Sequence, residues 1–167
     1  MTKMKKKSGS KDYTEAFLKS NKDYHYNLEE GAEPYLVSSG SMILDHVLGG
    51  GFGSGLHRFI GANEGGKTNE ALHVMHNMLK TVENSKGLFV MAEGRLSQEI
   101  RDRAGIKFVH SAEDWDVGTC LVLECHIMDT MIDFLRGLLK NNPDKEKFCI
   151  VIDSMDGLIT KEDLEKG

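Results

Sequence analysis

The sequence has no long apolar run and no apolar stretch near its N-terminus. A membrane-spanning helix needs about 18 or more consecutive apolar residues, and no part of this chain reaches that length. The first residues also lack the apolar core of a secretory signal peptide. The 167 residues, 40% of them hydrophobic, suffice for one domain with a real core. We therefore expect a cytoplasmic protein with no membrane association.

Cysteine is scarce as well. The three cysteines, Cys120, Cys125 and Cys149, all lie in apolar stretches typical of β-strands, which favours reduced thiols in a core. A zinc site would have to recruit His110 or His126. Cys120 and Cys125 are five residues apart on one expected strand, so their side chains would point to opposite faces. This spacing argues against zinc.

Charge is unevenly distributed along the chain. Residues 1–22 carry seven lysines against Asp12 and Glu15, a net of +5, which leaves −10 for the remainder of a chain whose total is −5. The basic run Lys3–Lys7 is typical of a solvated, disordered tail, with contact to nucleic acid as the alternative. Residues 1–34 therefore predict a basic tail, a short helix around Thr14 and a linker, and residues 35–167 predict the domain proper.

A glycine-rich stretch carries the strongest motif. Gly61–Thr68, which we call the phosphate loop, fits the pattern G-x-x-x-x-G-K-[ST] in full. Leu56, Phe59 and Ile60 before it predict a short buried strand, and the periodicity of residues 70–81 predicts a helix after it. Strand, loop and helix in this order predict a nucleoside triphosphate site. Its expected nucleotide-binding residues are Gly61, Ala62, Asn63, Glu64, Gly65, Gly66, Lys67, Thr68 and Asn69.

The residue types in the phosphate loop suit that chemistry. Glycines let backbone amides approach phosphate oxygens, and the following helix N-terminus adds unpaired donors. Lys67 supplies a positive charge for the β- and γ-phosphates, and the Thr68 hydroxyl is suited to ligate Mg²⁺.

Strands and helices alternate over the rest of the domain. Strands are expected at 88–92, 107–110, 120–125 and 148–152, the last buried on both faces, and helices at 39–48, 98–104 and 127–140. The alternation predicts an α/β fold with a mostly parallel sheet. Because the carboxyl ends of parallel strands meet at one edge, Asp153 should lie beside Lys67 and Thr68 and hold Mg²⁺. Glu93 ends another strand at the same edge, either as a base for the attacking water or as an ordinary surface residue.

These motifs resemble those of the RecA-type recombinases, in particular the T4-like phage branch and its bacterial relatives, from about Val37 to Ile159. The matching pieces are Ser39-Gly40-Ser41 through Leu44-Asp45, Leu48-Gly49-Gly50-Gly51, Ala92-Glu93 and Ile152-Asp153-Ser154. Ser97 and Ile100 stand where the bacterial family often has an acidic residue and a tyrosine near the base.

The resemblance implies a RecA-like P-loop NTPase fold with three layers. It also implies a DNA-dependent ATPase in DNA recombination and repair, which forms filaments on single-stranded DNA and catalyses homologous strand exchange. By this resemblance, Glu93 is expected to be the general base, and Lys67 is the second expected catalytic residue. Thr68 and Asp153 are the expected Mg²⁺ ligands, and ATP is the expected nucleotide. The helix near Phe17 becomes a candidate arm that docks on the neighbouring subunit.

In that family, the DNA-binding loops and the γ-phosphate sensor lie beyond the position that corresponds to Gly167. We therefore expect the chain to be the N-terminal part of the ATPase core, truncated after the Walker B strand, with poor ATP hydrolysis and no stimulation by DNA. Two alternatives stay open. One is a ring-forming ATPase of helicase or clock type, and the other is a nucleotide-binding regulatory paralogue without turnover.

Overall fold

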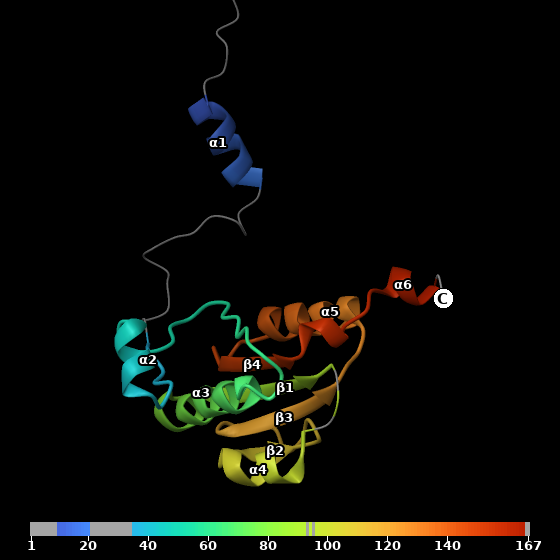
Figure 1. Ribbon diagram of the computed structural model, residues 1–167. Helices are drawn as coiled ribbons and strands as arrows, with labels where there is room; N and C mark the ends of the chain where they lie inside the picture. Colours follow the sequence, from blue (N-terminus) through green and yellow to red (C-terminus); the bar gives the residue numbers. More distant parts are fainter. Residues whose placement is uncertain (1–9, 21–34, 93, 95, 166–167) are drawn as a thin grey trace, which may run out of the picture. The chain divides into compact units, whose positions relative to one another are not determined.

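A computed structural model describes residues 10–20, 35–92, 94 and 96–165 (Figure 1). The chain divides into two units, Met1–Pro34 and Tyr35–Gly167. In the first unit, the expected short helix is present as α1 (Ser10–Ser20), with Tyr13 and Phe17 exposed. A docking role for α1 stays a prediction, and the expected basic tail and linker lie outside the described residues.

The second unit is built on a parallel sheet. Its strands are β1 (Ser85–Met91), β2 (Lys107–Val109), β3 (Thr119–Glu124) and β4 (Lys147–Asp153). They are ordered β2-β3-β1-β4, and every pairing is parallel. The predicted α/β class with a parallel sheet is confirmed. Met91 pairs with Glu124 on one side and with Asp153 on the other, so these three strands end at one edge.

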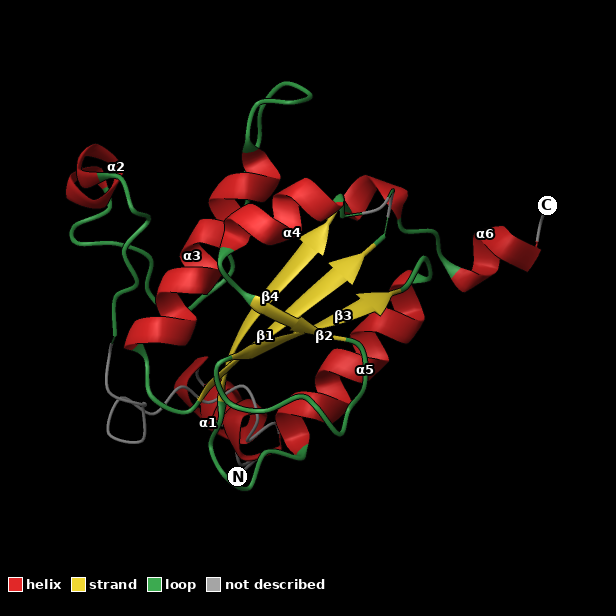
Figure 2. Ribbon diagram, turned by 90° about the horizontal axis from the view of Figure 1, so that it is seen from below, coloured by secondary structure: helices red, strands yellow, loops and turns green. Residues whose placement is uncertain are grey.

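Helices cover both faces of this sheet (Figure 2). One face carries α3 (Lys67–Thr81) and α4 (Gln98–Ala104), and the other carries α5 (Met128–Lys140). Two short helices, α2 (Met42–Val47) and α6 (Lys161–Glu165), and a 3₁₀ turn at Met155–Gly157 complete the described elements. The result is a three-layer arrangement.

Alternate residues of β1 build the two halves of the core. Leu88 and Val90 are fully buried and pack with Met131 of α5, whereas Phe89 packs with Met75 of α3 on the other face. Gly87 lies where α3 comes closest to the sheet. A Cβ at Gly87 would lie 2.9 Å from Met75 Sδ and 3.0 Å from Cys120 Cβ, so the packing excludes a larger residue.

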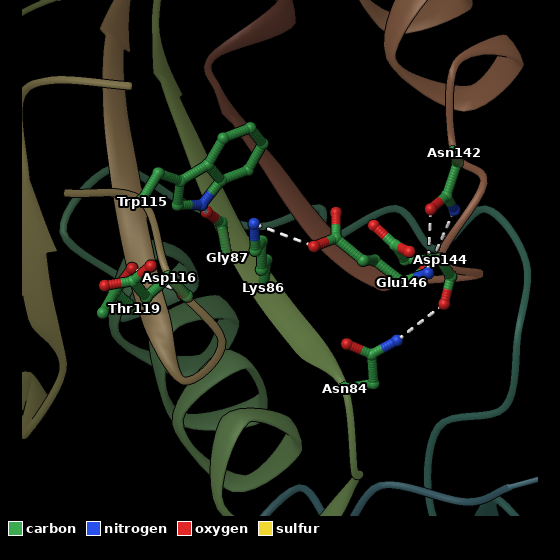
Figure 3. Close-up of polar contacts among 9 residues, drawn as sticks. All are labelled: Asn84, Lys86, Gly87, Trp115, Asp116, Thr119, Asn142, Asp144 and Glu146. Atoms are coloured by element: carbon green, nitrogen blue, oxygen red, sulfur yellow. Dashed lines mark hydrogen bonds and ion pairs between the residues drawn. The ribbon is translucent and has the colours of Figure 1, made fainter. Parts of the chain in front are cut away.

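The opposite end of the sheet holds a cluster of polar contacts around Trp115 (Figure 3). Trp115 Nε1 donates to Gly87 O at 2.8 Å, and Lys86 Nζ pairs with Glu146 Oε1 at 2.8 Å. Lys86 Nζ also lies 5.3 Å from the centre of the Trp115 ring, within range of a cation–π contact. These contacts anchor the Trp115 indole against the sheet.

The predicted strand at Leu56, Phe59 and Ile60 is wrong. Leu56 is 100% exposed and Ile60 80% exposed, and no strand is assigned to this described segment. An apolar run becomes a buried strand only when a neighbouring strand supplies backbone partners, and residues 53–60 make no backbone pairing of the kind that joins Val37 to Phe52.

One burial prediction is also wrong, and one predicted helix is shorter than expected. β4 was expected to be buried on both faces, but all seven of its residues are half-buried. Among the described strands, β1 is the single neighbour of β4, so β4 lies at an edge of the sheet. The helix expected at 39–48 shortens to α2, and its Met42, Ile43 and Val47 are exposed. Ser41 accounts for the later start, because its hydroxyl caps α2 by accepting from Leu44 N.

Candidate functional site

The phosphate loop runs directly into α3, and two of its glycines are required by geometry. Gly66, the residue before α3, has φ of 82°, in the left-handed region that favours glycine. A Cβ at Gly65 would lie 2.9 Å from Ala62 O. The loop therefore folds tightly onto the N-terminus of a 15-residue helix, whose first amides have no helical partners.

Lys67 lies over this loop. Its Nζ donates to Gly61 O at 3.0 Å and to Ala62 O at 2.7 Å. The ammonium group is thus held at the loop by two carbonyl groups, which leaves one of its three donors for an anion bound by the loop amides.

Thr68 and Asp153 meet although 85 residues separate them. Thr68 Oγ1 donates to Asp153 Oδ2 at 2.8 Å, and both side chains are half-buried. The first turn of α3 supplies the hydroxyl, and the C-terminal end of β4 supplies the carboxylate. A hydroxyl and a carboxylate are hard oxygen donors of the kind Mg²⁺ prefers, so the residues present fit that metal.

The described residues contain no cluster of three or more His, Cys, Asp or Glu side chains that would hold a metal by itself. Mg²⁺ commonly takes one or two protein oxygens and completes its shell with water and phosphate oxygens. The Thr68–Asp153 pair is suited to that mode of binding, which depends on a bound nucleotide.

Glu93 lies outside the described residues, so its place relative to the loop is not assigned. The residue before it is tied into the edge of the sheet, since Ala92 N donates to Asp153 O at 2.9 Å. The expected role of Glu93 as a base stays a prediction.

A shallow hollow of about 170 Å³ follows the loop and is lined by Glu64, Gly65, Gly66, Lys67, Thr68, Asn69 and Ile100. A larger hollow of about 250 Å³ adjoins it, because Asn69 and Ile100 line both. The larger one lies between α3 and α4 and adds His73, His76 and Arg103, which the sequence did not indicate as site residues. The smaller hollow contains Lys67 and Thr68, the residues expected to bind phosphate and Mg²⁺.

His76 of α3 lines the larger hollow. It is half-buried, and its Nδ1 lies 3.0 Å from Gly105 O, at the end of α4. A glycine is required there, because Gly105 has φ of 63° and a Cβ would lie 2.9 Å from His76 Cε1. The contact links α3 to α4 along the larger hollow.

The segment before the loop is organised by Asp45. Its carboxylate accepts from Ser38 Oγ at 2.5 Å, from Ser39 Oγ at 2.6 Å and from Ser39 N at 2.7 Å. These hydrogen bonds, that of Ser38 foremost, lower the pKa of Asp45. Asn77 Nδ2 of α3 donates to Ser38 O at 2.8 Å, so the segment is attached to the helix that follows the loop.

The three-layer arrangement with a parallel sheet is consistent with a RecA-like α/β fold. In a comparison with curated proteins, the chain is 32% identical over 138 residues to the DNA repair and recombination protein RadB of Methanosphaera stadtmanae. The match covers 81% of this chain and 56% of that relative, so the chain spans little more than half of its length. This similarity supports a relationship to the RecA-type family. No family model and no solved structure matches the chain.

None of the helices in the described ranges is long and apolar enough to cross a membrane.

Proposed function

We propose that the chain is the nucleotide-binding part of a RecA-type recombinase that binds and hydrolyses ATP with Mg²⁺. The observation that carries this proposal is the hydrogen bond between Thr68 and Asp153 at 2.8 Å. It brings a hydroxyl at the start of α3 and a carboxylate at the end of β4 to one point beside the phosphate loop. A glycine-rich turn that binds no nucleotide would not require a hydroxyl and a carboxylate beside it.

Each residue has a distinct part in the proposed reaction. The amide of Gly66 binds a phosphate oxygen, Lys67 donates to the β- and γ-phosphates, and Thr68 and Asp153 would hold Mg²⁺. The metal, when bound, neutralises charge that develops on the phosphates. Glu93 orients and deprotonates the attacking water, as the Ala92-Glu93 motif implies.

The base of the nucleotide would lie against Ile100. This residue lines both hollows, next to Asn69 from the first turn of α3. An aliphatic side chain gives apolar contact without aromatic stacking, so we expect weak discrimination among bases at this position.

Calorimetric titration with ATP and Mg²⁺ tests the site. Lys67→Ala should raise the Kd at least about tenfold, because it removes a charged donor to phosphate. Lys80→Ala, at the exposed C-terminal end of the same helix, is the matched control and should leave the Kd unchanged. Equal affinity in both variants would reject the phosphate loop as the nucleotide site.

Glu93→Gln should retain binding and lose hydrolysis, and retained hydrolysis would remove Glu93 from the mechanism.

The finer parts of the proposal concern DNA. Assembly into filaments on single-stranded DNA and homologous strand exchange follow from the resemblance, as does the T4-like phage branch. We also propose a cytoplasmic location. The relative from Methanosphaera stadtmanae is a DNA repair and recombination protein, and the similarity to it supports a role in recombination. Electron microscopy with ATP and single-stranded DNA should show helical filaments, whereas closed rings would favour the motor alternative.

A further inference from the structure

A continuous series of hydrogen bonds crosses the strand ends that carry the site. It starts with Thr68 and the side chain of Asp153, and continues from Asp153 O to Ala92 N at 2.9 Å. Ala92 O in turn lies 2.8 Å from Nδ1 of His126, the second residue after β3. Ala92 is therefore held from both sides, by β4 through its amide and by His126 through its carbonyl.

The contacts of His126 define the chemistry of its ring. A carbonyl oxygen only accepts, so Nδ1 must carry a hydrogen to donate to Ala92 O. Nε2 lies 3.3 Å from Glu124 Oε1, and donation to that carboxylate requires a hydrogen on Nε2 as well. The imidazolium form alone makes both contacts, whereas the neutral Nδ1–H tautomer makes only the contact to Ala92.

These two contacts favour the charged ring. The hydrogen bond to Ala92 O, and secondarily the one to Glu124, raise the pKa of His126 above its ordinary value. The side chains of His126 and Glu124 are 54% and 70% exposed, so their ion pair is screened by solvent and contributes little to stability. The contact to the Ala92 carbonyl is thus the one with structural consequence.

We propose that His126 is a positioning residue for the hydrolysis of ATP, which holds the peptide group that joins Ala92 to Glu93. This inference rests on the proposed function. The carbonyl of that peptide group belongs to Ala92 and its nitrogen to Glu93, so a hydrogen bond to Ala92 O limits rotation of the backbone where the expected base begins. A displacement of about 1 Å in a reacting group can cost on the order of 100-fold in rate.

The groups around His126 are few. Among the described residues, Glu124 is the charged group that contacts the ring, and Ile159 N donates to His126 O at 2.9 Å on the backbone. Glu93 and Arg95 follow Ala92 closely in the sequence and are the other titratable or charged groups to consider. From the sequence, His126 was considered only as a zinc ligand. Its contact with Ala92 O could not be predicted, because a hydrogen bond to a backbone carbonyl has no sequence motif.

Single-turnover hydrolysis of ATP, with the protein in excess and the pH varied from about 5.5 to 8.5, tests the role on either side of the ordinary histidine pKa. His126→Ala should lower the rate constant about tenfold and leave the Kd for ATP within about twofold, because the loop itself is untouched. His126→Asn should restore most of the rate, since its amide can donate to Ala92 O, and should lose the pH dependence that the imidazole contributes. His110→Asn, an exposed histidine after β2, is the control and should match the parent.

A measurement without turnover separates this inference from the proposed function. In NMR titrations, the carbonyl carbon of Ala92 and the ring of His126 should shift with one common midpoint, higher than that of His126 in the urea-unfolded chain. The shift of the Ala92 carbonyl should vanish in His126→Asn. An Ala92 carbonyl that does not titrate, or a His126→Ala protein that hydrolyses ATP as the parent does, would overturn the role of His126. A parent that does not bind ATP would overturn the proposed function itself, and the role of His126 with it.

Discussion

Replacing Thr68 with valine keeps the shape of the side chain and removes the hydroxyl that reaches Asp153. The lost bond has a length of 2.8 Å and a charged acceptor. Hydrogen bonds to charged groups contribute about 1.5–3 kcal/mol. Both side chains are half-buried, so water can partly replace the donor, and we expect the lower end of that range. Thr68→Val should therefore lower the free energy of unfolding by about 1.5 kcal/mol.

The stability cost of Thr68→Val should depend on the charge of residue 153. Asp153→Asn keeps an acceptor oxygen but removes its charge, and charge-assisted hydrogen bonds are about twice as strong as neutral ones. Thr68→Val should consequently cost only about half as much, near 0.7 kcal/mol, when residue 153 is asparagine. The difference between the two costs is the coupling energy of the pair.

Urea unfolding followed by the fluorescence of Trp115, the single tryptophan, measures all four proteins of this cycle. Thr81→Val is the matched control, because Thr81 Oγ1 donates to Asn77 O at 2.7 Å on an exposed part of the same helix. It should change stability by no more than about 0.5 kcal/mol. If Thr68→Val costs the same with Asp and with Asn at position 153, the pair is not coupled and the reasoning fails.

Two further predictions concern the core. Gly87→Ala should destabilise by about 1–3 kcal/mol through overpacking against Met75 and Cys120, whereas Gly137→Ala in α5, whose Cβ meets nothing within 4 Å, should stabilise by about 0.5–1 kcal/mol. Thermal unfolding measures both, and a neutral Gly87→Ala would contradict the close approach of α3 to the sheet. Burial raises the pKa of Cys120 to about 12 and of Cys149 to about 11. The unfolded thiols ionise at lower pH, so the stability that the two neutral thiols contribute is complete below about pH 8.5 and declines as the pH rises toward 11. Replacing both with alanine should flatten this decline in a series of urea titrations, and an unchanged slope would contradict it.

Local chemistry made part of the fold predictable. The helix expected at 98–104 is present over Gln98–Ala104, with Ser97 Oγ accepting from Ile100 N at its start and Gly105 in the left-handed region at its end. The alternation of strands and helices was sufficient to predict a parallel sheet. The residues that begin and end α4 are close together in the sequence.

Predictions that depended on distant partners fared unevenly. The meeting of Thr68 and Asp153 followed from a rule about the ends of parallel strands and needed no knowledge of the intervening 85 residues. The strand at 56–60 failed because apolar character does not tell whether a neighbouring strand is present. The contact of His126 with Ala92 O was not predictable, since every residue has a carbonyl and the sequence does not distinguish the one that accepts.

The most direct test of the central claim uses Mn²⁺ in place of Mg²⁺ during NMR of the uniformly labelled protein. Thr68 and Asp153 are proposed to hold the metal together with the phosphates of ATP. Amide signals of these two residues should therefore broaden strongly when Mn²⁺ and ATP are both present, and much less with Mn²⁺ alone. Broadening centred on another part of the chain, or equally strong at this pair without ATP, would contradict the claim.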